Sequence, residues 1–146
     1  EIYQCDWSSD VCSSDLTVDS QTIVTVDGSA GFKGLVTDYL SGLIVKTGAN
    51  IVYSCGPMGM MAAITDITKA HNIYHHASIE ESMACGIGIC MVCVIPIKDE
   101  KGNYQMDRAC VVGPVVDAEK VYWGTSAEDE QNNRKLPEGT WGYDKF

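Results

Sequence analysis

A cluster of three cysteines constrains this chain more than any other feature of its sequence. Cys85, Cys90 and Cys93 follow a C-x4-C-x2-C spacing, and Cys110 lies further along the chain. Neither a helix nor a strand can wrap three such thiols around one centre, so these residues predict a tight loop. The spacing is typical of four thiolates that hold a [2Fe–2S] cluster.

Two glycines lie between the first pair of these cysteines. Gly86 and Gly88 can adopt positive φ, and without side chains they let backbone N–H groups approach the sulfurs. Hydrogen bonds of that kind stabilise the extra negative charge of a reduced cluster and raise its potential. We therefore expect a glycine-containing loop in which amides point at sulfur.

Other uses of the cysteines remain open. Structural zinc is usually held by two close C-x2-C pairs, and Cys110 has no near partner in the sequence. Disulfides require an oxidising compartment, and nothing here indicates export. Buried, inert thiols are a further alternative. Of these interpretations we favour ligation of a [2Fe–2S] cluster.

Size and charge bound the class of protein. The chain has 146 residues, of which 45% are hydrophobic, enough for one domain or for a half-domain with a small cluster module. Its formal charge of −10 argues against nucleic acid, which needs a basic surface. No apolar run reaches about 18 residues, so we expect no membrane span. Cluster-spaced cysteines favour a reducing, cytoplasmic location.

The first sixteen residues differ from the rest. Residues 1–16 lack periodicity, Ser-Ser-Asp occurs twice, and residues 6–16 resemble a translated sequencing adapter. We treat this segment as a non-native leader and exclude Cys5 and Cys12 from the ligand set. We also expect the natural chain to begin upstream, so that this sequence is N-terminally truncated.

Residues 17–79 alternate between strand and helix patterns. Short β-branched or apolar runs predict strands, and apolar residues three and four positions apart predict helices. The predicted strands are 21–26, 51–54 and 75–79, the middle one buried, and the predicted helices are 35–43 and 58–71. This order is typical of a parallel α/β sheet, in which ligands bind beyond the carboxyl ends of the strands.

Two turns follow predicted strands and are candidates for nucleotide contacts. One spans residues 27–31, and the other begins with Cys55-Gly56-Pro57. Because both turns follow strands of the predicted parallel sheet, we expect them to lie on the same rim. The glycines do not form G-x-G-x-x-G, so plain connectivity remains an alternative. Cys55 could equally be a small buried residue.

Residues 80–123 form the predicted cluster module. An apolar, β-branched run at 92–97, a polar turn and a second predicted strand at 104–112 indicate a hairpin that returns Cys110 to Cys93. Val115, Val116 and Val121 would pack a last turn or short strand. Residues 124–146 are polar and nearly patternless, which predicts a tail.

Four blocks in order resemble a known family. They span residues 25–34, 53–60, 80–93 and 108–116, the last two being the most specific. Together they resemble the electron-transfer subunit of NAD-dependent dihydroorotate dehydrogenase, within the ferredoxin–NADP reductase superfamily, over residues 17–123. The expected fold is α/β: part of a parallel-sheet nucleotide-binding domain, then a small β-rich [2Fe–2S] module.

The resemblance implies roles for individual residues. Cys85, Cys90, Cys93 and Cys110 would ligate iron, and Cys55 would act beside the flavin–nicotinamide stack. Nucleotide contacts would come from two turns: Gly28, Ser29 and Gly31, then Cys55, Gly56, Pro57 and Met58. FAD would bind mainly in an N-terminal barrel that this chain lacks.

The resemblance also implies a partner and a pathway. An FMN-containing catalytic subunit would oxidise dihydroorotate, and electrons would reach NAD⁺ through the cluster and FAD, in pyrimidine biosynthesis. The expected assembly is a heterotetramer, and the fragment alone is expected to be inactive. The alternatives are another flavin and Fe–S NAD(P)H reductase subunit, or a non-catalytic Fe–S or zinc-held module.

Overall fold

The computed structural model describes residues 20–80 and 82–124 of the chain. It separates into two compact units, Glu1–Thr47 and Gly48–Phe146, and each is described by itself. The fold class is mixed α/β, in agreement with the sequence. The predicted leader and Cys5 and Cys12 lie outside the described residues, as does the tail beyond residue 124.

The first unit holds a short strand pair and a helix. β1 (Val24–Thr25) pairs in parallel with β2 (Phe32–Lys33), and α1 (Val36–Thr47) follows. Asp38 caps the start of α1, because its carboxylate accepts a 2.8 Å hydrogen bond from the Leu35 N–H. The observed strand is shorter than the predicted one at 21–26. After Thr25 the chain loops through residues 27–31 and forms β2 beside β1, running in the same direction.

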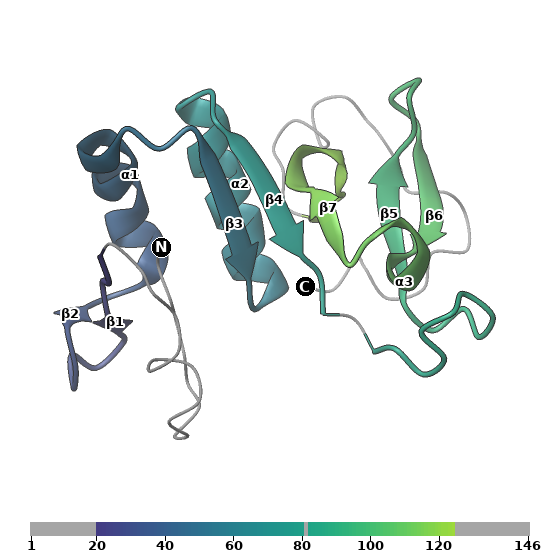
Figure 1. Ribbon diagram of the computed structural model, residues 1–146, viewed down its shortest axis with the longest axis horizontal. Helices are drawn as coiled ribbons and strands as arrows, with labels where there is room; N and C mark the ends of the chain where they lie inside the picture. The colour runs from purple at the N-terminus through teal and green to yellow at the C-terminus, as the bar shows by residue number, and fades with distance from the viewer. Residues whose placement is uncertain (1–19, 81, 125–146) are drawn as a thin grey trace. The chain divides into compact units, whose positions relative to one another are not determined.

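The second unit contains a three-stranded sheet in the order β3-β4-β7 (Figure 1). β3 (Ile51–Cys55) and β4 (Tyr74–Ser78) are parallel, as the sequence predicts. The helix α2 (Met58–Ala70) connects them and packs on both. β7 (Val115–Asp117) adds to β4 in antiparallel fashion, which the sequence did not predict.

The two faces of this sheet are covered unequally. His75 and Ala77 are buried, whereas Ile51, Tyr53 and Tyr74 are exposed. Side chains alternate between faces along a strand, so the face on which α2 packs is covered and the other is open. The expectation that residues 51–54 form a fully buried strand is therefore wrong for one face.

A buried histidine ties β4 to both neighbours. His75 Nε2 lies 2.7 Å from Ser54 Oγ, and His75 Nδ1 lies 3.0 Å from Thr65 Oγ1. Because the Thr65 hydroxyl donates to the Met61 carbonyl at 2.8 Å, the network assigns the proton to Nδ1. Burial lowers the pKa of His75 to about 4, which keeps the ring neutral.

A hairpin follows the cysteine loop. β5 (Val94–Lys98) pairs antiparallel with β6 (Tyr104–Arg108), and Asp99 Oδ1 accepts hydrogen bonds from the N–H groups of Lys101 and Asn103, both at 2.8 Å. The predicted strand at 104–112 is wrong beyond Arg108. The chain there forms a helical turn, α3 (Ala109–Val112), which carries Cys110.

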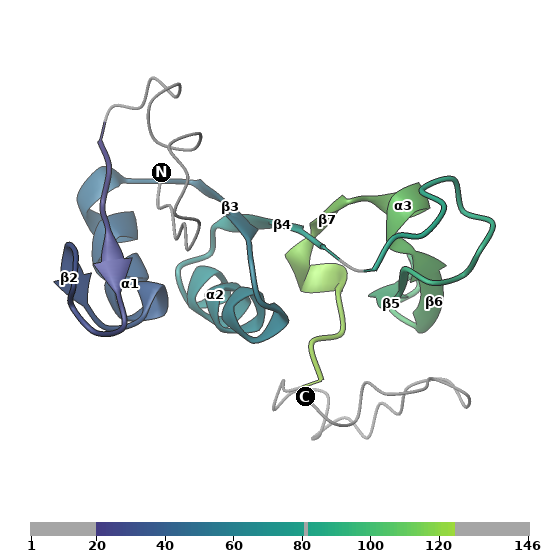
Figure 2. The same ribbon diagram turned by 90° about the horizontal axis from the view of Figure 1, so that it is seen from below.

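One apolar cluster joins the sheet to the hairpin. Figures 1 and 2 show β7 between β4 and the hairpin strands β5 and β6. Its buried members lie in or next to α2, β4, the cysteine loop, β5, α3, β7 and the 3₁₀ turn η1 (Ala118–Lys120), and they are Met61, Ala77, Ile79, Cys93, Ile95, Ala109, Val116, Ala118 and Val121. Backbone hydrogen bonds reinforce it: Ile79 N donates to Pro114 O at 2.9 Å, and Tyr122 N to Pro96 O at 3.0 Å. The cysteine-bearing half therefore shares a core with the β3–α2–β4 half.

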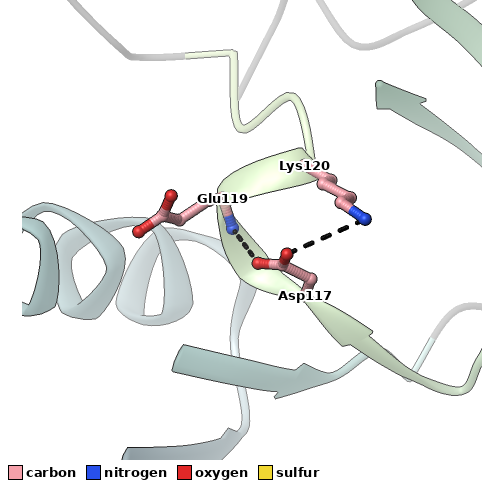
Figure 3. Close-up of polar contacts among 3 residues, drawn as sticks. All are labelled: Asp117, Glu119 and Lys120. Atoms are coloured by element: carbon pink, nitrogen blue, oxygen red, sulfur yellow. Dashed lines mark hydrogen bonds and ion pairs between the residues drawn. The ribbon is translucent and has the colours of Figure 1, made fainter. Parts of the chain in front are cut away.

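A single side chain shapes the end of β7. The Asp117 carboxylate accepts a 3.1 Å hydrogen bond from the Glu119 N–H and so caps η1 (Ala118–Lys120), a 3₁₀ turn (Figure 3). Its other oxygen lies 4.0 Å from Lys120 Nζ, an exposed pair that contributes little. Among the described residues, no helix is long and apolar enough to cross a membrane.

Candidate metal centre

The four candidate ligands lie on two segments of the second unit. Cys85, Cys90 and Cys93 belong to the loop that leaves the carboxyl end of β4, and Cys110 lies in α3 after the hairpin. Cys93 is buried, Cys85 and Cys110 are half-buried, and Cys90 is exposed. All four are free thiols, so the chain presents them as potential ligands rather than as disulfides.

The first two cysteines form one pair. The N–H groups of Ile89 and Cys90 donate to Cys85 Sγ at 3.3 and 3.4 Å, which confirms the expected approach of amides to sulfur. The Cys90 and then the Ile87 amide, together with the Cys90 thiol, lower the pKa of Cys85 to about 6. This thiol is therefore prepared to be a thiolate, the form that binds metal.

The last two cysteines form a second pair. The Cys110 N–H and then the Cys110 thiol bond to the Cys93 sulfur, which lowers the pKa of Cys93. The same sulfur–sulfur contact, and then burial, raise the pKa of Cys110, so Cys93 is the first of the two to lose its proton. The Ala109 N–H also donates to the Cys93 carbonyl at 2.7 Å, fixing α3 to the end of the loop.

The charge of Cys85 raises the pKa of both Cys93 and Cys110, as a smaller cause than the contacts within the second pair. Within residues 20–80 and 82–124, no three His, Cys, Asp or Glu side chains gather about one metal ion. A [2Fe–2S] cluster takes two thiolates at each iron, which is compatible with two separate thiol pairs. That the four cysteines together hold such a cluster stays a prediction.

The loop backbone has the conformation that its glycines permit. Gly86 and Gly88 have φ of +66° and +81°, in the left-handed region that glycine tolerates. Met91 adopts φ of +59° with a full side chain, which is uncommon outside glycine and asparagine. Such backbone strain tends to persist where function requires it.

One contact at this site was missed by sequence reasoning. The Arg108 guanidinium donates to the Gly88 carbonyl at 2.5 Å, linking the end of β6 to the cysteine loop. Arg108 stands two residues before Cys110, but an arginine at that place carries no signal without knowledge of the loop's path.

The second predicted turn follows β3 in the same unit. Cys55 ends β3, paired in register with Ser78 at the end of β4, and its thiol is exposed. Partial desolvation, and then the charge of Glu80, raise the pKa of Cys55. Pro57 begins α2, and its carbonyl accepts from the N–H groups of Met60 and Met61.

The first predicted turn lies in the other unit and follows β1, which pairs with β2 and not with β3, so the expectation of one sheet with a shared rim is wrong. Two amides of this turn already have hydrogen-bond partners. The N–H of Ser29 donates to Asp27 Oδ1 at 2.9 Å, and that of Gly28 to the Thr25 carbonyl at 3.3 Å. The local packing alone explains why residue 31 is a glycine, because a Cβ there would lie 2.1 Å from the Ile23 carbonyl oxygen. Nucleotide contacts by Gly28, Ser29 and Gly31 stay a prediction.

These elements define a class of protein, in which an α/β unit carries a module made of a cysteine loop and a hairpin. Residues 80–122 match the family described as the iron–sulfur cluster binding domain of dihydroorotate dehydrogenase B. The expected resemblance is thereby confirmed.

Similarity to curated relatives extends over more of the chain than residues 80–122. The chain is 41% identical over 99 residues to the dihydroorotate dehydrogenase B (NAD(+)) electron transfer subunit of Caldanaerobacter subterraneus, covering 68% of this chain and 39% of that one. It is 39% identical over 99 residues to the electron transfer subunit homolog of Aquifex aeolicus, covering 68% and 36%. The chain thus spans about two fifths of the length of these relatives.

A solved structure is similar as well. It belongs to an NADH-dependent reduced ferredoxin-NADP oxidoreductase, described in connection with flavin-based electron bifurcation. The TM-score is 0.59 at 31% identity, over 80% of this chain and 38% of that one. The likeness covers more of the chain than the cysteine module alone.

Proposed function

We propose that this chain is part of the electron-transfer subunit of an NAD-dependent dihydroorotate dehydrogenase, with Cys85, Cys90, Cys93 and Cys110 as the ligands of a [2Fe–2S] cluster. The observation that carries the proposal is the two thiol pairs within a segment of the matching family. When bound, the cluster supplies a one-electron carrier between two flavins.

The sheet supports a nucleotide site next to this centre. The turn with Cys55 leaves the carboxyl end of β3, and the cysteine loop leaves the carboxyl end of the neighbouring parallel strand β4. Ligands of open α/β sheets bind at this end. We assign NAD and the edge of FAD to residues 55–58, with Cys55 beside the reacting rings, and the main FAD site to a barrel outside this chain.

The surface of the cysteine loop suits a protein partner. The loop exposes apolar side chains beside its thiols, with Ile87 at 72% and Ile89 at 75% exposure, and α3 adds Val111 at 57%. Adjacent exposed apolar groups of this kind mark docking surfaces. We assign this surface to an FMN-containing dihydroorotate-oxidising subunit, in a heterotetramer within the reducing cytoplasm.

Reconstitution tests the cluster assignment. The full chain is incubated anaerobically with ferrous iron and sulfide, and iron, sulfide and zinc are counted per chain. Equal iron and inorganic sulfide, with the visible absorption of a [2Fe–2S] centre, is the expected result. A colourless protein holding one zinc would overturn it in favour of a zinc-held module.

A second measurement tests the partner. The reconstituted chain is mixed with an FMN-containing dihydroorotate dehydrogenase subunit, and dihydroorotate is added. Oxidation to orotate releases two electrons and two protons, and the expected result is dihydroorotate-dependent bleaching of the cluster absorption. No bleaching, while the FMN is reduced, would contradict the assigned partner.

The similar oxidoreductase structure favours one alternative, a reductase subunit that serves NAD(P)H and ferredoxin. The same chain would then be bleached by reduced ferredoxin and not by dihydroorotate with its FMN subunit. Comparing the two donors at equal concentration distinguishes the functions.

A further inference from the structure

We propose that Arg108 is a positioning residue that clamps the cysteine loop to α3 and so holds the two thiol pairs together before any metal binds. The inference rests on the proposed [2Fe–2S] function, which it deepens. Arg108 is not a candidate ligand, and its part is to fix the places of residues that are.

The first observation is the contact itself. Arg108 Nη1 donates to the Gly88 carbonyl at 2.5 Å, across 20 positions in sequence. Gly88 is buried, so its carbonyl needs a partner inside the protein. The guanidinium is a strong, charge-assisted donor, and its planar fork is ordered at less cost than a lysine side chain.

The second observation is that the contact connects the segments of both thiol pairs. Gly88 lies in the loop between Cys85 and Cys90, and Arg108 lies two residues before Cys110, where the Ala109 N–H donates to the Cys93 carbonyl at 2.7 Å. Holding the Gly88 carbonyl therefore ties the loop of the first pair to the segment that carries the fourth thiol. Loss of the clamp would free these two segments from each other at this point.

The third observation is steric. A methyl group at Gly88 would lie 2.6 Å from Val111 Cγ2 and 3.8 Å from Arg108 Nη1, so both side chains flank this glycine. Arg108 precedes α3 and Val111 belongs to it. Polar and apolar contacts from the same turn thus meet at one point of the loop.

The charge of Arg108 is available to the loop. Among the residues that the structure describes, no carboxylate lies within ion-pair distance of its guanidinium. Lys98 on β5 offers a matched control, because it is a cation on the same hairpin whose ammonium lies over the Tyr104 ring, 5.2 Å from the centroid. Either substitution removes one positive charge from the hairpin. Of the two residues, Arg108 is the one that contacts Gly88.

The experiment compares Arg108→Met, Arg108→Lys and Lys98→Met with the unmodified full chain after anaerobic reconstitution. The readouts are the rate of iron loss to a chelator and the electron paramagnetic resonance spectrum of the reduced cluster. We expect Arg108→Met to lose iron about tenfold faster and to broaden the spectrum, since such outer partners affect metal affinity about 10- to 100-fold. Arg108→Lys should recover part of the loss, and Lys98→Met should match the unmodified chain.

Hydrogen exchange of the metal-free chains gives a second arm that does not need the cluster. Arg108→Met should speed exchange of the loop amides 86–93 and leave α2 unchanged, whereas Lys98→Met should alter neither. If Arg108→Met keeps both the exchange and the iron-loss rate within about twofold of the unmodified chain, the clamp is refuted. If it unfolds, as judged by circular dichroism, Arg108→Ala, which also removes the donor, decides by the same limits.

The two proposals fail in different ways. If the unmodified chain takes up no iron and sulfide, the proposed function fails, and the exchange experiment still decides on the clamp. If it takes up the cluster and Arg108→Met behaves as Lys98→Met does, only the clamp fails.

Discussion

Two turns leave the same end of the sheet, and they treat cysteine in opposite ways. After β4, backbone amides point at Cys85 and lower the pKa of its thiol. After β3, partial desolvation and Glu80 raise the pKa of Cys55. Neighbouring strands thus present one thiol prepared for metal and one prepared to stay neutral. The difference comes from the surroundings of each sulfur, which are backbone amides at Cys85 and partial burial beside a carboxylate at Cys55, rather than from the residue type.

Replacing a ligand in the cysteine loop should have the largest effect. Cys90→Ser removes one thiolate of the Cys85–Cys90 pair, and we expect reconstituted chains to lose essentially all visible absorption and dihydroorotate-dependent bleaching. The FMN reduction of the partner subunit should remain. Cys55→Ser is the matched control, an exposed cysteine in the other turn, and should keep its iron. Retention of a full cluster by Cys90→Ser would break the comparison.

Alanine substitutions at the two loop glycines should distinguish the cost of backbone strain from the cost of steric conflict. Gly86→Ala and Gly88→Ala both place a side chain at positive φ, which costs roughly 1 kcal/mol each. Only Gly88 has a neighbour within 4 Å, Val111 Cγ2 at 2.6 Å, so Gly88→Ala should cost roughly 1–3 kcal/mol more. Urea unfolding measures the difference. Equal costs for the two variants would show that α3 does not pack on the loop.

Acid should weaken the sheet half through His75. The folded chain keeps this ring neutral down to about pH 4, whereas the unfolded chain takes up the proton below its ordinary pKa of 6.5. Stability is therefore fully present above pH 6.5 and is lost as the pH falls towards 4, by about 3 kcal/mol in all.

Urea unfolding of the unmodified chain and of His75→Gln at pH 7 and pH 4.5 measures this contribution. The unmodified chain should lose more stability between the two pH values than His75→Gln does. Parallel losses would mean that the buried network with Ser54 and Thr65 does not hold the ring neutral.

The smallest effect is expected at Cys55. The side chain is exposed, so Cys55→Ala should change the free energy of unfolding by no more than about 0.5 kcal/mol. Iron content should be unchanged, while hydride transfer in a complete subunit should slow. Iron loss in this variant would mean that the ligand set has been misassigned.

Residue patterns within short stretches of the sequence predicted the helices, strands and loops that are formed by residues close together in the chain. The apolar spacing of residues 58–71 anticipated α2, and the alternation around residues 75–79 anticipated β4. The cysteine spacing and its two glycines anticipated a loop in which amides contact sulfur. Each signal lies within about a dozen residues, the range over which backbone geometry relates side chains directly.

Contacts between distant segments were decided by the tertiary structure. Cys110 lies in a helical turn because the chain folds over the Cys93 end of the loop, although its apolar neighbours resemble a strand. β7 joins β4 in antiparallel fashion because the hairpin returns the chain to that edge. The Arg108–Gly88 contact has no local signal, since a side chain finds a carbonyl 20 positions away only once the loop has its path. The sequence determined which atoms could bind metal, and packing decided which of them meet.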